Sequence, residues 1–180
     1  MNHQQEQVNQ ISATEPDWQR EQLDFGEWNP GKRLLASIRS YQRWRNGGAR
    51  CYPLRYWAVL RHRFWSVATG AEIPLTCRIG GGLRLPHPNG VVIHPEAQVG
   101  PNCLIFQQVT LGTLASGGTP VVGGHVDIGA GAKLLGPVVV GDHAVIGANA
   151  VVVTDVPAHH VAMGIPAHSR PRQRQGAEDA

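Results

Sequence analysis

An aliphatic residue recurs at every sixth position through most of the second half of the chain. The longest uninterrupted series comprises Val122, Ile128, Leu134, Val140, Ile146 and Val152, and an earlier series comprises Ile93, Val99, Ile105 and Leu111. The residue four positions after each of these is small or β-branched. An α-helix repeats every 3.6 residues and an ordinary strand alternates every two, so neither explains this spacing. A strict six-residue period predicts a parallel β-helix, in which three short strands and three turns make one triangular coil.

The six-residue period is interrupted at two places. Ile93 follows Leu85 by eight positions instead of six, and the added turn, Pro-His-Pro-Asn-Gly, contains His87. Val122 follows Leu111 by eleven positions, and the ten residues between them, 112–121, predict a loop that leaves the coil. Loops on a rigid scaffold commonly carry function. We therefore expect the functional site at these two interruptions.

The rest of the chain divides around this repeat. Residues 1–31 are polar without an apolar period and are expected to be flexible, as is the tail at 169–180, whereas 71–168 should form the β-helix domain. Residues 32–70 have apolar side chains near helical spacing and predict a short helical segment of two amphipathic helices. We expect its aromatic side chains to pack on the main domain while its arginines remain solvated. A nucleic-acid or membrane-surface role is the alternative.

Composition narrows the class of protein. Charged residues make up 16% of the chain, against a usual share of about 25%, and the net charge of +3 would suit a phosphorylated ligand but is weak evidence for nucleic acid. The three cysteines, Cys51, Cys77 and Cys103, are odd in number and lack metal-binding spacing, which indicates reduced thiols in a cytoplasmic protein. No apolar run approaches the roughly 20 residues of a membrane span.

Three ordered motifs make a more specific pattern. They are Val109-Thr110-Leu111-Gly112, Ile128-Gly129-Ala130-Gly131-Ala132-Lys133 and Gly164-Ile165-Pro166-Ala167. In this order the chain, over about residues 72–168, resembles the serine O-acetyltransferases. The resemblance implies a left-handed β-helix, acetyl-CoA as co-substrate, and acetyl transfer to the hydroxyl of L-serine in cysteine biosynthesis. It also implies a homotrimer with the acetyl-CoA groove between adjacent subunits.

The resemblance assigns roles to individual residues. His87, in His87-Pro88-Asn89-Gly90, matches the family's catalytic histidine, and Glu72 stands where the family usually has the aspartate that orients it. A neutral imidazole can remove the hydroxyl proton during attack on a thioester, so no covalent intermediate is needed. The matching positions of the acetyl-CoA groove are Gly112, Thr113, Ala130 and Ala148. Cys77 and Cys103 occupy the small inward position of the repeat and are expected to fill the core.

Two departures from the family keep the acceptor open. In the family, an aspartate before the histidine and an Arg-His pair in the projecting loop usually contact the substrate. Here Pro86 stands in place of that aspartate, and the loop at 112–121 lacks the Arg-His pair. Losing these contacts would permit a neutral hydroxyl acceptor, so an O-acetyltransferase of a sugar or a surface polysaccharide precursor is the alternative. A non-catalytic β-helix used for binding or assembly is the third hypothesis.

The remaining histidines are expected to be structural or solvated. His94 begins a turn after Ile93, whereas His125 and His143 lie 18 residues apart and should stack on successive coils, pointing outward. Carbonic anhydrases of the same fold hold zinc with three histidines, two of them five residues apart. His87 and His94 are seven residues apart and have no third partner, so we expect no metal.

Overall fold

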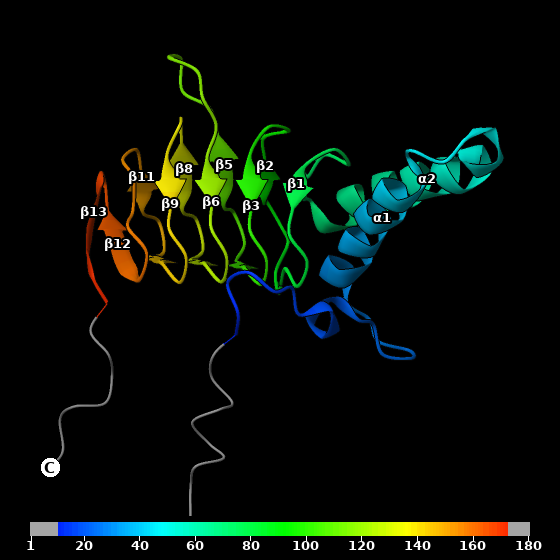
Figure 1. The fold of residues 1–180 in the computed structure, drawn as a ribbon, viewed down its shortest axis with the longest axis horizontal. Helices are drawn as coiled ribbons and strands as arrows, with labels where there is room; N and C mark the ends of the chain where they lie inside the picture. Colours follow the sequence, from blue (N-terminus) through cyan, green and yellow to red (C-terminus); the bar gives the residue numbers. More distant parts are fainter. Residues whose placement is uncertain (1–10, 173–180) are drawn as a thin grey trace, which may run out of the picture.

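The computed structural model describes residues 11–172, and most of them form a parallel β-helix (Figure 1). Short strands form three sheets along the three sides of the coil. Sheet 1 contains β1 (Arg78–Ile79), β3 (Gln98–Val99), β6 (Val121–Val122) and β9 (Val139–Val140). Sheet 2 contains β4 (Leu104–Ile105), β7 (Asp127–Ile128), β10 (Val145–Ile146), β12 (His160–Gly164) and β13 (Ala167–Pro171). Sheet 3 contains β2 (Val92–Ile93), β5 (Thr110–Gly112), β8 (Lys133–Leu135) and β11 (Val151–Val152).

The periodic aliphatic residues form the interior of this coil, as the spacing predicted. In sheet 3, Ile93, Leu111 and Leu134 are register partners on successive coils, and each is at most 1% exposed. The small residues at the fourth step fill the corners between sheets, and Ala97, Ala132 and Ala144 there are fully buried. Each coil therefore covers the apolar side chains of the next.

Two helices pack against each other beside β1 at one end of the coil (Figure 1). The first, α1 (Pro30–Trp44), begins where the side chain of Asn29 accepts a 3.0 Å hydrogen bond from the Lys32 N–H, with proline at the first helical position. The second, α2 (Tyr52–Thr69), ends at Gly70, which has a left-handed φ of 66°. Short 3₁₀ turns, η2 (Trp18–Glu21) and η3 (Ala49–Cys51), precede α1 and α2 respectively.

The expectation that the aromatic residues of this segment pack on the main domain is wrong for most of α2. Trp65 is 8% exposed and lies in the core with Leu34, Leu35 and Ile38 of α1. In contrast, the side chains on the opposite side of the helix are solvated: Tyr56 64%, Trp57 64%, Leu60 39%, Phe64 61% and Val67 86% exposed. The helical spacing predicted one apolar face, but α2 has apolar side chains on two sides, and only the side with Trp65, which packs beside α1 and Trp28, is buried.

Residues 12–21 lie against the β-helix, although residues 1–31 were expected to be flexible. The buried Asn102 donates 2.7 Å hydrogen bonds to the carbonyl oxygens of Ser12 and Glu15 and accepts a 2.8 Å bond from the Asp17 N–H. A side chain at Gly124 would collide with the carbonyl of Ala13. The part of this expectation that concerns residues 1–10 lies outside the described residues.

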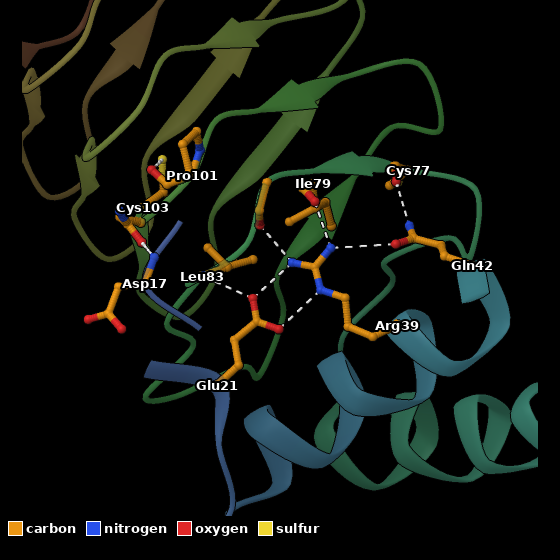
Figure 2. Close-up of polar contacts among 11 residues, drawn as sticks. Asp17, Glu21, Arg39, Gln42, Cys77, Ile79, Leu83, Pro101 and Cys103 are labelled. Atoms are coloured by element: carbon orange, nitrogen blue, oxygen red, sulfur yellow. Dashed lines mark hydrogen bonds and ion pairs between the residues drawn. The ribbon is translucent and has the colours of Figure 1, made fainter. Parts of the chain in front are cut away.

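An ion pair joins this N-terminal segment to both the helices and the coil (Figure 2). Arg39 of α1 bonds to both carboxylate oxygens of Glu21, at 3.0 and 2.8 Å, and donates 2.6 Å bonds to the carbonyls of Ile79 and Gly80. Glu21 also accepts a 3.1 Å bond from the Leu83 N–H. Because the pair is largely buried and shares these backbone partners, it holds three parts of the chain in one arrangement.

The C-terminal end differs from the expected flexible tail in the same way. Strand β13 pairs antiparallel with β12, so residues 169–171 belong to a hairpin that closes sheet 2. Residues 173–180 of the expected tail lie outside the described residues. Within residues 11–172, no helix combines the length and apolarity needed to cross a membrane.

Candidate functional site

The His87 turn lies at the edge where sheet 2 passes to sheet 3. Within the turn, the Val91 N–H bonds to the Pro88 carbonyl at 3.1 Å, and Gly90 has a left-handed φ of 69°. The Gly90 N–H donates a 2.9 Å bond to the carbonyl of Gly70, the residue that ends α2. His87 is exposed, and its ring makes no hydrogen bond within residues 11–172. The backbone is therefore tied down while the imidazole remains free.

Glu72 lies on the coil beside this turn. It forms a parallel bridge to Val92, its N–H bonds to the Val91 carbonyl at 2.8 Å, and its carbonyl accepts a 2.9 Å bond from the Ile93 N–H. These contacts bring Glu72 beside the strand that leaves the His87 turn. The carboxylate is exposed and makes no bond to the imidazole in the part of the chain described. The structure thus brings the two residues to neighbouring backbone positions without joining their side chains.

Two of the four predicted groove residues lie on the same edge of the triangular coil as His87. We call this the His87 edge. It consists of successive turns at 86–91, 106–109, 129–132 and 147–150. Backbone bonds of 2.8–2.9 Å connect each turn to the next: Gln108 N–H to Asn89 O, Gly131 N–H to Gln107 O, and Asn149 N–H to Ala130 O. Ala130 and Ala148 therefore follow the His87 turn along one line, Ala130 half-buried and Ala148 exposed.

The other two predicted residues lie across sheet 3. Gly112 ends β5 and pairs with Leu135, and Thr113 begins the loop that projects from the coil near β5 in Figure 1. The outward residues of sheet 3 separate this pair from the His87 edge. The predicted groove residues therefore occupy both edges of sheet 3, and Thr113 and residues 114–118 are exposed.

Lys133 is a further candidate that the sequence analysis left without a role. It lies outward on β8 between the two edges, and its ammonium group donates to the Gln108 carbonyl on the His87 edge. It is half-buried and makes no ion pair within the described residues. Its position one residue before the inward Leu134 was the available signal, because the preceding residue of a short strand faces outward.

The two buried cysteines cannot act as nucleophiles in this state. Cys77 and Cys103 are 1% and 0% exposed, which confirms that they fill the core. Burial raises the pKa of Cys77 to about 11 and that of Cys103 to about 12, so both thiols stay protonated near neutral pH. Among residues 11–172, no group of three His, Cys, Asp or Glu side chains is arranged to hold a metal ion.

Three histidines form a column on a different edge, between sheets 1 and 2. His125 and His143 approach at 2.9 Å between their Nδ1 atoms, and the His143 and His159 rings stack 4.9 Å apart with an interplanar angle of 9°. The predicted stacking on successive coils is confirmed. Asn102 occupies the same place one coil earlier, and all four residues have left-handed φ values of 51–61°. The repeating turn therefore explains this column.

Burial lowers the pKa of His125. The carboxylate of Asp127 acts in the opposite direction and raises this pKa, whereas His143, Arg20 and Arg172 lower it by smaller amounts. Because the unfolded chain then binds more protons as the pH falls below about 6.5, stability should decrease there and level off below the folded-state pKa.

We expect His125→Asn to reduce the difference in melting temperature between about pH 7.5 and about pH 5. Asparagine is already accepted at Asn102 with φ 61°, so the substitution suits the backbone. His168→Asn, at an exposed position on β13, is the control and should leave the difference as in the wild type. An unchanged pH dependence in His125→Asn would contradict the assignment.

A cleft of about 850 Å³ lies apart from these positions. It is lined by Gln42, Arg45 and Asn46 at the end of α1 and after it, and by residues of the first coils that include Arg78 and Glu96. None of the predicted site residues lines it. The cleft therefore lies at the junction between the helices and the coil. The candidate site is instead the surface of sheet 3 and its two edges.

The chain is similar in sequence to several serine acetyltransferases, although no family model matches it. It is 38% identical over 137 residues to the serine acetyltransferase of Helicobacter pylori (strain J99), covering 69% of this chain and 80% of that protein. It is 44% identical over 106 residues to that of Mycobacterium tuberculosis, covering 57% of this chain and 46% of the relative. The chain thus spans less than half of the second relative's length.

Solved structures agree with the sequence comparison. A serine acetyltransferase of Vibrio cholerae matches with a TM-score of 0.69 and 34% identity, covering 82% of this chain and 57% of that one. A serine acetyltransferase in complex with CoA matches with a TM-score of 0.67 and 33% identity, covering 79% of this chain and 58% of that one. These proteins have the left-handed β-helix fold, which confirms the predicted fold of this chain.

Proposed function

The chain belongs to the serine acetyltransferase family, and we propose that it transfers the acetyl group of acetyl-CoA to a hydroxyl, with L-serine as the first acceptor to test. The observation that carries this proposal is the line of Ala130 and Ala148 behind the exposed His87 turn on one edge of the coil. A thioester bound on the adjoining surface of sheet 3 could place its reactive end at His87.

In the proposed reaction His87 is the general base. Its imidazole takes the hydroxyl proton as the hydroxyl oxygen attacks the thioester carbon, and the imidazolium then returns the proton to the departing CoA thiolate. Glu72 is proposed to orient the ring and stabilise its protonated form, as the carboxylate does in other histidine dyads. The side chains must move together for this, since they are not bonded in the free chain; such bonds often tighten only when substrate is present.

The coenzyme is proposed to bind across sheet 3. The backbone groups of Gly112, Thr113, Ala130 and Ala148 border this surface, and the Lys133 ammonium supplies a positive charge between them that suits a phosphate. A solved relative is described as a complex with CoA, which supports a coenzyme site in this fold. The loop at 112–121 is proposed to border the acceptor pocket.

A homotrimer in the cytoplasm is the proposed form of the protein. Sheet 1 exposes the paired residues Val121 and Val139 at 37% and 50%, an apolar area that a neighbouring subunit could cover. A neighbour placed there would stand close to the surface of sheet 3 and could complete the groove. The three free cysteines suit a reducing compartment.

A sugar hydroxyl is the second candidate acceptor. Pro86 is exposed beside His87 and offers neither charge nor a hydrogen-bond donor to an amino-acid substrate. The projecting loop at 113–119 likewise contains no charged residue. A neutral acceptor would lose nothing by these replacements, whereas the ammonium and carboxylate of serine would find no charged partner at Pro86 or in residues 113–119.

The test is acetyl-CoA consumption by the purified chain with L-serine, with nucleotide-linked or lipid-linked sugars, and without acceptor. We expect turnover that depends on an added hydroxyl acceptor. Turnover with sugars and none with serine would replace the first acceptor by the second. Absence of acetyl-CoA binding, measured by calorimetry, would leave a non-catalytic β-helix and contradict the proposal.

A further inference from the structure

The solvated side of α2 carries a continuous apolar stripe that the proposed reaction does not use. Trp57, Leu60, Phe64 and Val67 follow one another at steps of three and four residues, which places them on one face of a helix. Their exposed fractions range from 39% to 86%. Tyr56 borders the stripe at 64% exposure. A folded chain in water rarely leaves such a face uncovered, so this stripe indicates a contact surface.

The charge around this stripe is of one sign. Residues 28–71 contain no aspartate or glutamate, and they carry nine basic residues: Lys32, Arg33, Arg39, Arg43, Arg45, Arg50, Arg55, Arg61 and Arg63. Two of these, Lys32 and Arg39, pair with Glu27 and Glu21. Arg61 and Arg63 are exposed and flank the stripe on its two sides. The partner must therefore accept apolar side chains and also be anionic.

We propose that α2 docks on the surface of an anionic lipid bilayer. The stripe would enter the boundary between headgroups and acyl chains, and Arg61 and Arg63 would contact lipid phosphates on either side. Helices with an aromatic and aliphatic face bordered by arginines bind membranes in this way. Tryptophan and tyrosine suit that boundary, because each has an apolar ring and a polar group.

The charge pattern disfavours the other possible occupants. A second copy of the chain joined by two-fold symmetry would place the same basic surface against itself, with no acidic residue in the segment to pair with it. A nucleic acid would satisfy the arginines but would leave Leu60 and Val67 without apolar partners. A lipid surface satisfies both sets of side chains.

Docking would also place the His87 turn near the membrane. Gly70 follows the last residue of α2, and its carbonyl accepts the 2.9 Å bond from the Gly90 N–H inside that turn. The turn is thus attached to one end of the docked helix. Docking does not depend on the proposed acetyl transfer, but it would bring that site within reach of an acceptor carried on a lipid.

Co-sedimentation of the full chain with vesicles tests the proposal without any acetyl donor. We expect binding to vesicles of phosphatidylcholine with phosphatidylglycerol and little binding to phosphatidylcholine alone. Raising the salt from about 0.1 to about 1 M should weaken binding, because the screening length falls from about 10 to about 3 Å. Equal binding to both vesicles, or binding to neither, would overturn the proposal.

Two pairs of substitutions separate the arginines from the stripe. Arg61→Glu with Arg63→Glu, and separately Trp57→Ser with Phe64→Ser, should each weaken vesicle binding about tenfold or more. Matched controls are Arg170→Glu and Ile165→Ser, at exposed positions of the β12–β13 hairpin at the opposite end of the coil (Figure 1). Both controls should bind as the wild type does.

Further measurements identify a different occupant or a folding defect. In Trp57→Phe, vesicles should still bind, and the blue shift of tryptophan fluorescence on binding should shrink. Circular dichroism of each variant shows whether the helices are retained.

A change of oligomeric state in Trp57→Ser with Phe64→Ser, without lipid, would instead assign the stripe to a protein contact. Binding of a random-sequence oligonucleotide in place of vesicles, lost in the double arginine variant, would assign it to nucleic acid.

Discussion

His87→Ala should lower kcat for acetyl transfer by about 10²–10⁴-fold, the usual contribution of a positioned general base. The KM for acetyl-CoA should change little, because the proposed coenzyme contacts come from other turns and from sheet 3. The melting temperature should also be preserved, since the ring is exposed and unbonded in the described part of the chain. The measurement is steady-state turnover at saturating acceptor, with the melting temperature of each variant alongside.

The neighbouring residues provide the controls for this result. His94→Ala removes a histidine whose Nδ1 accepts a 3.3 Å bond from the Glu96 N–H in the next turn, and it should leave kcat unchanged. Glu72→Gln should lower kcat roughly tenfold or more, because the proposed role of Glu72 is to position the imidazole. Glu72→Asp keeps the carboxylate and should have a kcat close to that of the wild type. If His87→Ala turned over acetyl-CoA as fast as His94→Ala, the mechanism would be wrong even if acetyl transfer were observed.

Leu111→Ala should lower the free energy of unfolding by about 2–5 kcal/mol, the usual range for a buried leucine. Leu111 is fully buried and lies in register between Ile93 and Leu134 on the coils either side of it. Its removal leaves a void that rigid coils cannot close by moving together. Denaturant unfolding at fixed protein concentration measures the change, because assembly would otherwise alter the apparent stability.

Leu114→Ala is the matched control for this substitution. Leu114 is 38% exposed at the base of the projecting loop, so the same truncation removes far less buried surface there. We expect a loss of less than about 1 kcal/mol. Similar losses at the two positions would mean that the interior column does not dominate the stability of the coil.

The coil could be predicted from the sequence because each of its turns repeats one requirement. An inward residue at every sixth position must be aliphatic, and the small residue four later must fit the corner, so the pattern is local and repeated. The same regularity made the stacking of His125 and His143 predictable. The interruption at His87 was visible for this reason, since two added residues break a strict period.

The contacts of the N-terminal segment could not be predicted in the same way. Asn102 binds Ser12 and Glu15 through their carbonyl oxygens, and any residue type can offer a backbone carbonyl. Arg39 likewise binds the backbone of Ile79 and Gly80 as well as Glu21. Such bonds leave no spacing or composition signal, so the polar sequence of residues 12–21 resembled that of an unattached segment.

The sequence by itself determined the β-helix, its inward residues and the two interruptions, because these depend on side-chain size at fixed local spacing. Only the tertiary structure decided that His87 lies on the same edge as Ala130 and Ala148, because the repeat does not say how the coil accommodates the two residues added at the His87 turn. Only the tertiary structure also decided which face of α2 is covered. Trp65 and Phe64 are adjacent aromatic residues, and the packing of α2 beside α1 and Trp28 buries Trp65 while Phe64 stays 61% exposed.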